Sequence, residues 1–178
     1  MYVLHTYGTS TWGTYCTGIQ SSASVGFTVP APDCVRLEAT EARMTMVLVT
    51  RSIALNAKPA DVWSLVGGFQ AVPDWHPGVE SSTPGTLGEV ETRRLSIKGG
   101  GEIYEKSLGS DGMSYGYAIL ESPLPVANYR AIISVVDAGG KAVLVWSSTF
   151  EDMAEGAGAA AVVGVYEAGI AALTAKFP

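Results

Sequence analysis

Charged residues are scarce in this sequence, and so are cysteine and histidine. Charged side chains make up 16% of the 178 residues, against roughly 25% in an average soluble protein. The formal net charge is -6, and the longest basic cluster is Arg93-Arg94, whereas phosphate binding relies on clustered Lys and Arg. We therefore expect no nucleic-acid partner. No uninterrupted apolar run approaches the ~20 residues of a membrane span, so we expect a soluble protein without one.

The first thirty-two residues contain no Lys, Arg, Asp or Glu. A secretory signal needs a basic start and a continuous apolar block, and a transit peptide needs arginines. Neither pattern occurs, so we expect a cytoplasmic protein. Residues 1–43 are predicted to be a Thr/Ser/Gly-rich leader, flexible or loosely docked, and 44–178 a single domain. Met44 and Met46 leave open whether the leader is native or reflects the choice of start codon.

Scarce metal-binding residues exclude several chemistries. Cys16 and Cys34 fall in the leader, and two cysteines in a chain without a signal peptide more often stay reduced than form a disulfide. The remainder has one histidine, His76, and no acidic calcium loop. No Gly-x-Ser-x-Gly elbow occurs, and the glycines at 99–101 lie in a hairpin turn, which is not a nucleotide fingerprint. We predict no metal and no cofactor.

Regular apolar periodicity begins at Met46. Alternation up to Asn56 predicts a strand of about ten residues. KPADVWSLVGG then predicts a short helix, with Pro59 near its start and Gly67-Gly68 at its end. One more turn is expected over 69–72, before Pro73, and the Pro/Gly-rich stretch from 74 to 86 is expected to be irregular.

Later segments predict strands over 89–97, 102–108, 114–121, 129–137 and 142–151, separated by short turns. Short connections make neighbouring strands antiparallel. From about 154 to 177 the apolar period changes to that of one helix face. We therefore predict an α+β fold: a curved antiparallel sheet of six to seven strands wrapped around a long C-terminal helix, with two short helices after the first strand.

Four segments, in this order and spacing, resemble a known superfamily: PADVWSLVGGFQAVPDWHPGV, YEKSL, YGYAILESPLPVANYRAII and VLVWSSTFE. From Met46 to the end the chain is similar to small bacterial SRPBCC proteins, the Bet v 1-like or START-like helix-grip fold, and most to their polyketide cyclase/dehydrase and MxaD-like branch. The resemblance implies a hydrophobic cavity between the sheet and the C-terminal helix. Members bind lipids, hormones or polyketides there, and some catalyse cyclisation or dehydration.

VPDWHP places Trp75 and His76 between two prolines that restrict the backbone. Trp75 serves either as an apolar wall of the pocket or as a plug of the core. His76 serves either as a proton donor or acceptor, or as a cap on a nearby carbonyl.

Arg93 and Glu105 lie on neighbouring predicted strands. Inside the cavity, Glu105 would be a general base and Arg93 would hold a ligand carboxylate or enolate. An ordinary ion pair on the sheet exterior is the alternative, and common enough to be favoured.

Aromatic residues with polar tips gather on the later strands and the last helix. Tyr117, Tyr129, Trp146 and Tyr166 supply either hydrogen bonds to a ligand in an apolar pocket or plain core packing. With Trp75, His76, Arg93 and Glu105 they form the predicted ligand site, in which His76 and Glu105 are the catalytic candidates.

Three functions follow from the resemblance and these residues. We expect a carrier or sensor of a hydrophobic or aromatic small molecule, monomeric or homodimeric. The alternative is a metal-free polyketide cyclase or dehydratase, a lyase or isomerase acting on a poly-ketone in the same cavity. The least favoured is a ligand-free protein-interaction module.

Overall fold

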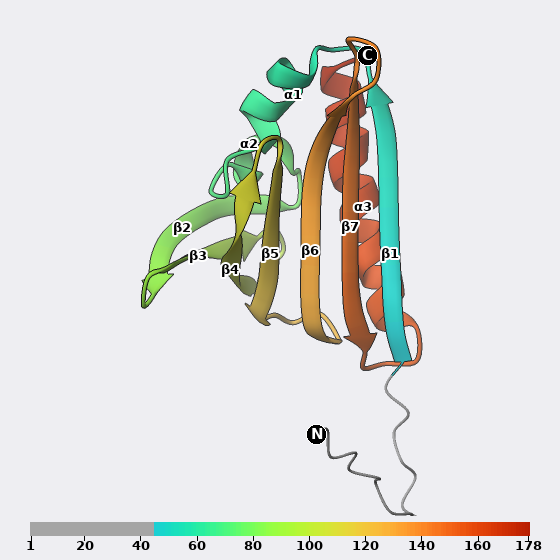
Figure 1. The fold of residues 1–178 in the computed structure, drawn as a ribbon. Helices are drawn as coiled ribbons and strands as arrows, with labels where there is room; N and C mark the ends of the chain where they lie inside the picture. The colour runs from blue at the N-terminus through green and yellow to red at the C-terminus, as the bar shows by residue number, and fades with distance from the viewer. Residues whose placement is uncertain (1–44) are drawn as a thin grey trace, which may run out of the picture. The chain divides into compact units, whose positions relative to one another are not determined.

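The computed structural model describes residues 45–178, so the predicted leader, with Cys16 and Cys34, lies outside the described residues. The elements run β1 (Thr45–Leu55), α1 (Pro59–Val66), α2 (Val72–Trp75), β2 (Val79–Leu87), β3 (Val90–Ile97), β4 (Glu102–Asp111), β5 (Ser114–Glu121), β6 (Val126–Asp137), β7 (Ala142–Asp152) and α3 (Ala157–Lys176). Figure 1 shows these elements, with the strands side by side in one sheet. The predicted α+β helix-grip fold is confirmed.

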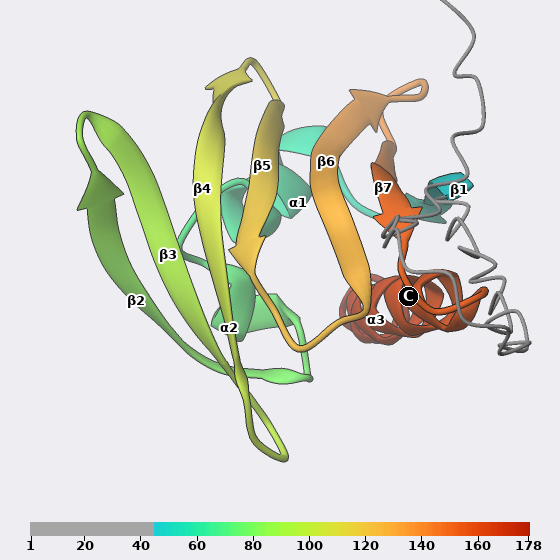
Figure 2. The same cartoon turned by 90° about the horizontal axis from the view of Figure 1, so that it is seen from below.

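The seven strands form one antiparallel sheet in the order β1-β7-β6-β5-β4-β3-β2. Its first strand pairs with its last, for example Val49 with Ser148. The other neighbours follow one another along the chain. Figure 2 shows that the sheet is strongly curved and that all three helices lie on its concave side.

The period-2 pattern of the strands places the core on this concave face. In β7 the inward residues Leu144, Trp146 and Phe150 are buried, whereas the outward Thr149 is exposed. β6 buries Tyr129, Ala131, Ile133 and Val135 in the same way. Successive side chains on a strand point to opposite faces, so alternation in sequence becomes one apolar inner wall.

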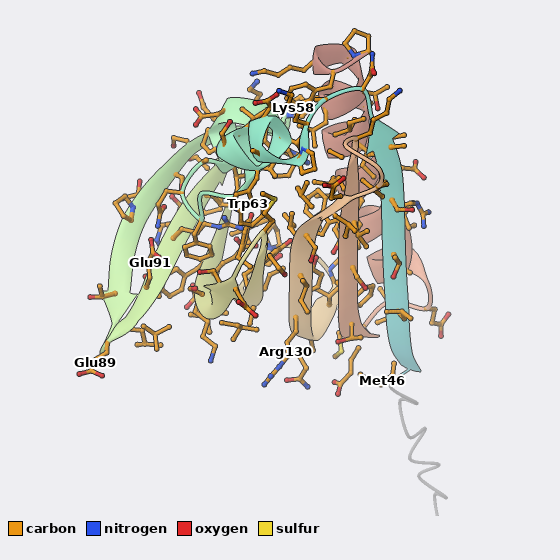
Figure 3. The ribbon with its side chains drawn as sticks, turned by 45° about the horizontal axis from the view of Figure 1, so that its top comes forward. Met46, Lys58, Trp63, Glu89, Glu91 and Arg130 are labelled. Carbon is orange, nitrogen blue, oxygen red and sulfur yellow. The ribbon has the colours of Figure 1, made fainter. Side chains whose placement is uncertain are left out.

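Helix α1 begins at Pro59 and ends before Gly67, as predicted. A Cβ on Gly67 would lie 2.4 Å from Trp63 Cε2, so only glycine lets the chain turn away here. Trp63 points from α1 toward the sheet (Figure 3), where its ring centroid lies 6.2 Å from that of Tyr115. This contact ties α1 to the concave face.

The following turn and strand differ from the prediction. α2 begins at Val72, where the predicted turn was expected to end, because Pro73 fits the first turn of a helix and lacks only an N–H that would be unpaired anyway. The stretch expected to be irregular contains β2. Pro84 is tolerated there because β2 is an edge strand with one neighbour.

The C-terminal helix α3 closes the concave side, with Val162, Tyr166, Gly169 and Leu173 buried. Ile170 is only partly buried and packs against the core beside these residues. By length and composition α3 is the one helix of the described residues that could also cross a membrane. Here it packs on the sheet, and the absence of a membrane span stays a prediction.

Candidate functional site

A cavity of about 170 Å³ lies between the sheet, α2 and α3. Its lining comes from α2 and the residues after it, the inner faces of β3 to β7, the loop between β5 and β6, and α3. Branched aliphatic side chains form much of the wall: Leu95, Ile97, Ile103, Ile119, Ile133 and Val162. The expected cavity between sheet and C-terminal helix is therefore present.

All eight residues predicted to contact a ligand line this cavity: Trp75, His76, Arg93, Glu105, Tyr117, Tyr129, Trp146 and Tyr166. Their function as ligand contacts stays a prediction. The aliphatic wall was not among the residues predicted from the sequence. Alternation held the signal, because Leu95 is two residues from Arg93, Ile103 two from Glu105 and Ile119 two from Tyr117, which puts each pair on one face.

Arg93 and Glu105 are directly opposite each other on β3 and β4. Arg93 Nε donates to Glu105 Oε2 at 2.6 Å, and the two side chains are 2% and 5% exposed. The favoured expectation of an ion pair on the sheet exterior is therefore wrong. The register places both residues on the face that carries Leu95, and the curvature of the sheet turns this face toward the core.

The Arg93 guanidinium has further partners within the core. Its Nη1 donates to the backbone carbonyl of Phe69, and its Cζ lies 4.2 Å from the Phe69 ring centroid and 5.1 Å from that of Tyr117. Burial raises the pKa of the Glu105 carboxyl, and the charge and hydrogen bond of Arg93 oppose that rise. The pair thus compensates two charges that would be costly to bury separately.

Both ring nitrogens of His76 are engaged by the protein. The Gly78 N–H donates to Nδ1 at 3.1 Å, so Nδ1 must be the unprotonated acceptor. Nε2 therefore carries the hydrogen and donates to the Val165 carbonyl of α3 at 2.9 Å. Burial lowers the pKa of His76, which favours this neutral form. The expected carbonyl contact is present, and it joins the turn after α2 to α3.

An aromatic cluster forms the other side of the cavity. Trp146 stacks on Tyr166 with ring centroids 4.0 Å apart, and its Nε1 donates to the Tyr117 hydroxyl at 3.0 Å. The hydroxyls of Tyr129 and Tyr166 lie 2.8 Å apart. Burial raises the pKa of all three tyrosines, so they are neutral phenols at physiological pH. They can donate hydrogen bonds but carry no charge.

Three buried polar atoms have no hydrogen-bond partner in the part of the chain that the structure describes. They are Trp75 Nε1, Tyr115 Oη and Ser148 Oγ. Trp75 is 5% exposed and packs its ring against Trp146 at a centroid distance of 5.5 Å. Both roles expected for Trp75 coincide in this position, because it fills one end of the core and also lines the cavity.

Within residues 45–178 no group of three or more His, Cys, Asp or Glu side chains is arranged to hold a metal ion. The arrangement offers an apolar chamber, one compensated ion pair, one neutral histidine and three phenols. Chemically this suits the enclosure of a mostly apolar molecule with few polar anchors.

Comparison with known proteins supports the resemblance seen in the sequence. The sequence model of the family described as "Polyketide cyclase / dehydrase and lipid transport" matches residues 46–178. The structure of the protein XoxI from Bacillus cereus is 31% identical, covers 74% of this chain and 95% of its own, and superposes with a TM-score of 0.68. A protein from Bacillus thuringiensis has the same identity and TM-score, with coverages of 74% and 98%.

More distant structural similarity extends to the structure of an enzyme. The ZhuI aromatase/cyclase from Streptomyces sp. R1128 is 18% identical, with a TM-score of 0.61 over 74% of this chain and 93% of its own. At this identity the likeness shows the fold alone. A comparison with curated proteins found no match. The SRPBCC-type resemblance is confirmed, and the narrower MxaD-like assignment stays a prediction. Over residues 46–178 this chain belongs to the polyketide cyclase/dehydrase and lipid transport family.

Proposed function

We propose that the domain binds a small hydrophobic or aromatic molecule in the cavity between sheet and α3, and acts as a cytoplasmic carrier or sensor. One observation carries this proposal: the wall is largely aliphatic and aromatic, and the ionisable side chains that line it are already engaged by other protein groups. Such a chamber gains binding energy from the burial of apolar surface.

The engaged groups favour binding over catalysis. A general base needs a free lone pair within hydrogen-bond reach of the proton it removes. Nδ1 of His76 accepts from Gly78 and has no lone pair to spare. Among residues 45–178, Oε2 of Glu105 is held by Arg93 and only Oε1 stays free, while the charge and hydrogen bond of Arg93 oppose the rise in the pKa of this carboxyl and so weaken it as a base. A carrier needs only a cavity of matching shape and a few polar groups that orient the ligand, and the chamber provides both.

The size of the cavity narrows the ligand. A dry apolar cavity of roughly 150 Å³ holds one benzene molecule, whereas typical ligand pockets measure roughly 300–1,000 Å³. At about 170 Å³ the chamber fits a single ring or a short chain. A fused polyketide or a long lipid would require side chains to move, so these classes are less favoured than a small aromatic compound.

Native mass spectrometry of the protein purified from its host tests the proposal, followed by denaturing extraction and titration with toluene, indole, naphthalene and palmitate. We expect toluene and indole to bind, and the native mass also gives the oligomeric state. The variant Ile103→Trp fills the cavity and should abolish binding. Its matched control is Leu108→Trp, on the same strand but 45% exposed, which should bind normally. An empty protein that binds none of these compounds would contradict the proposal and favour the interaction module.

The second candidate is a cyclase or dehydratase acting on a ketone. It is favoured by Glu105, a buried carboxyl that lines the cavity and whose pKa is raised by burial. Glu105→Gln separates the two functions: an enzyme would lose turnover on a ketone substrate, whereas a carrier shows no turnover before the change.

A further inference from the structure

The cavity contains two opposite charges that cancel. Arg93 is positive and Glu105 negative, the two are joined at 2.6 Å, and both line the chamber. Apart from the tyrosines, the lining has one more ionisable residue, His76, and its observed hydrogen bonds are those of the neutral ring. The net charge presented to a ligand is therefore zero.

The ion pair nevertheless leaves hydrogen-bonding capacity unused. Arg93 donates from Nε to Glu105 and from Nη1 to the Phe69 carbonyl. Among residues 45–178, its Nη2 and the second carboxyl oxygen of Glu105, Oε1, form no hydrogen bond with the protein. The two side chains are joined by the 2.6 Å contact between Nε and Oε2, so a spare donor and a spare acceptor belong to neighbouring groups of the cavity wall.

A charged ligand fits this arrangement poorly. A carboxylate at Nη2 would face the Glu105 carboxylate, and an ammonium at Oε1 would face the Arg93 guanidinium. Either would bring a third charge into an apolar chamber that holds no opposite charge to spare, and an unpaired buried charge is strongly unfavourable. This argues against the expectation that Arg93 holds a ligand carboxylate.

We infer that the ligand is uncharged and carries a hydroxyl group, as an alcohol or a phenol, which accepts from Arg93 Nη2 and donates to Glu105 Oε1. A hydroxyl provides one donor and two acceptor sites, and so matches both atoms at once. The inference rests on the proposed function, because it names the chemistry of the molecule in the same cavity.

Four compounds of one ring and similar size test it: benzyl alcohol, ethylbenzene, benzoate and benzylamine, titrated at about pH 7, where the last two are charged. We expect benzyl alcohol to bind at least about tenfold more tightly than each of the others. If benzoate binds as tightly as benzyl alcohol, the ligand is not selected for neutrality. If ethylbenzene binds as tightly as benzyl alcohol, the hydroxyl group of the ligand has no partner in the cavity. Either result overturns the inference while the proposed function stands. If none of the four binds, both fail.

Glu105→Gln provides an independent test, because it removes the negative charge and leaves the shape. Arg93 is then an unpaired buried cation, and we expect benzoate to bind at least about tenfold more tightly than to the unchanged protein and to raise the melting temperature. Glu102→Gln is the matched control, since Glu102 forms the neighbouring cross-strand pair with Arg94 at 3.3 Å but is 54% exposed. The control should keep the original order of affinities. An unchanged preference in Glu105→Gln would overturn the inference, and the ligand order of the unchanged protein still tests it if this variant does not fold.

Discussion

Gly169 has no side chain at a point of α3 where three aromatic rings approach the helix. A Cβ there would lie 2.9 Å from His76 Cδ2, 3.0 Å from Trp75 Cζ3 and 3.1 Å from Trp146 Cζ3. The first distance is shorter than a Cβ contact can be, the other two are tighter than most such contacts, and rings packed on one another have little room to move. The glycine therefore sets how closely α3 approaches the cavity wall.

Gly169→Ala should therefore destabilise the protein even though alanine is the better helix former. We expect a loss of about 1–3 kcal/mol in the free energy of unfolding, the usual cost of overpacking. Gly164→Ala, in the same helix with no atom within 4 Å of the added Cβ, should gain up to about 1 kcal/mol. Urea unfolding measures both, and a loss in Gly164→Ala or a gain in Gly169→Ala would contradict the packing argument.

His76 gives the stability of the fold a pH dependence. Its pKa in the folded protein is lowered by burial from the ordinary value of 6.5, so the unfolded chain binds the proton more readily. Stability therefore falls as the pH drops below about 6.5 toward the lowered value. The difference in unfolding free energy between the unchanged protein and His76→Asn should shrink between about pH 7 and pH 5. A difference that stays constant or grows would show that the folded state does not disfavour protonation.

At this scale the sequence predicted the eight polar and aromatic candidates that line the cavity, but neither the aliphatic wall nor what each residue does there. Alternation predicts that Arg93 shares a face with Leu95, and it does not say which face is inside. The inward direction follows from the sheet curvature and from Phe69, which supplies a carbonyl and a ring to the guanidinium. Such partners come from another part of the chain and leave no local pattern.

Among the elements, the start of α3 is held by Asp152, the last residue of β7, whose side chain accepts two backbone hydrogen bonds. Asp152 Oδ1 accepts from the Ala154 N–H at 2.9 Å, and Oδ2 accepts from the Ala159 N–H at 2.8 Å. These backbone donors lower the pKa of the Asp152 carboxyl. One side chain thus joins the final strand to the start of the helix.

Asp152→Ala should lower the urea midpoint of unfolding, and Asp152→Asn should lower it less, since the amide keeps one of the two acceptors. Because the folded pKa is depressed, this stabilisation is present at neutral pH and is lost as the pH falls through the acid range. The difference between Asp152→Ala and the unchanged protein should therefore narrow in acid. Equal midpoints for all three proteins at neutral pH would show that the two hydrogen bonds do not hold the helix start.

Secondary structure was predictable wherever the apolar periodicity and the glycine or proline turn signals agreed on the bounds of an element. The strands from β3 to β7 lie between glycine or proline turns and were expected within a few residues of their observed bounds. β2 was missed because Pro84 and Gly85 normally mark a turn, and only its position at the sheet edge makes them compatible with a strand. Edge position is a property of the assembled sheet.

At the scale of the whole molecule, the described residues form a packed core. Its packed residues run from Val47 to Phe177, and the family match begins at Met46. We expect a chain that starts at Met44 to unfold cooperatively with the unfolding free energy of the full chain, and to bind the same compounds. Calorimetry and titration of both chains check this. A shortened chain that unfolds without a cooperative transition would show that residues 1–43 contribute to the domain.

The architecture as a whole was within reach of the sequence, because element order, short connections and the resemblance agree on one topology. The volume of the cavity was not, because it depends on how far α3 stands from the sheet. That distance follows from ring packing around Gly169, Trp146 and Tyr166. Close packing of this kind is set by three-dimensional complementarity that one sequence does not display.

The pairing of β1 with β7 has a consequence for folding during synthesis. Val49 pairs with Ser148, which lies far later in the chain, so the sheet cannot be completed until β7 has been synthesised. Contacts so distant in sequence form slowly, and a ribosome delivers the chain from its N-terminus. The chamber also needs Tyr166, so it comes into being only when synthesis is nearly finished. A ligand therefore binds only the folded domain and can stabilise it, but it cannot guide the early steps of folding.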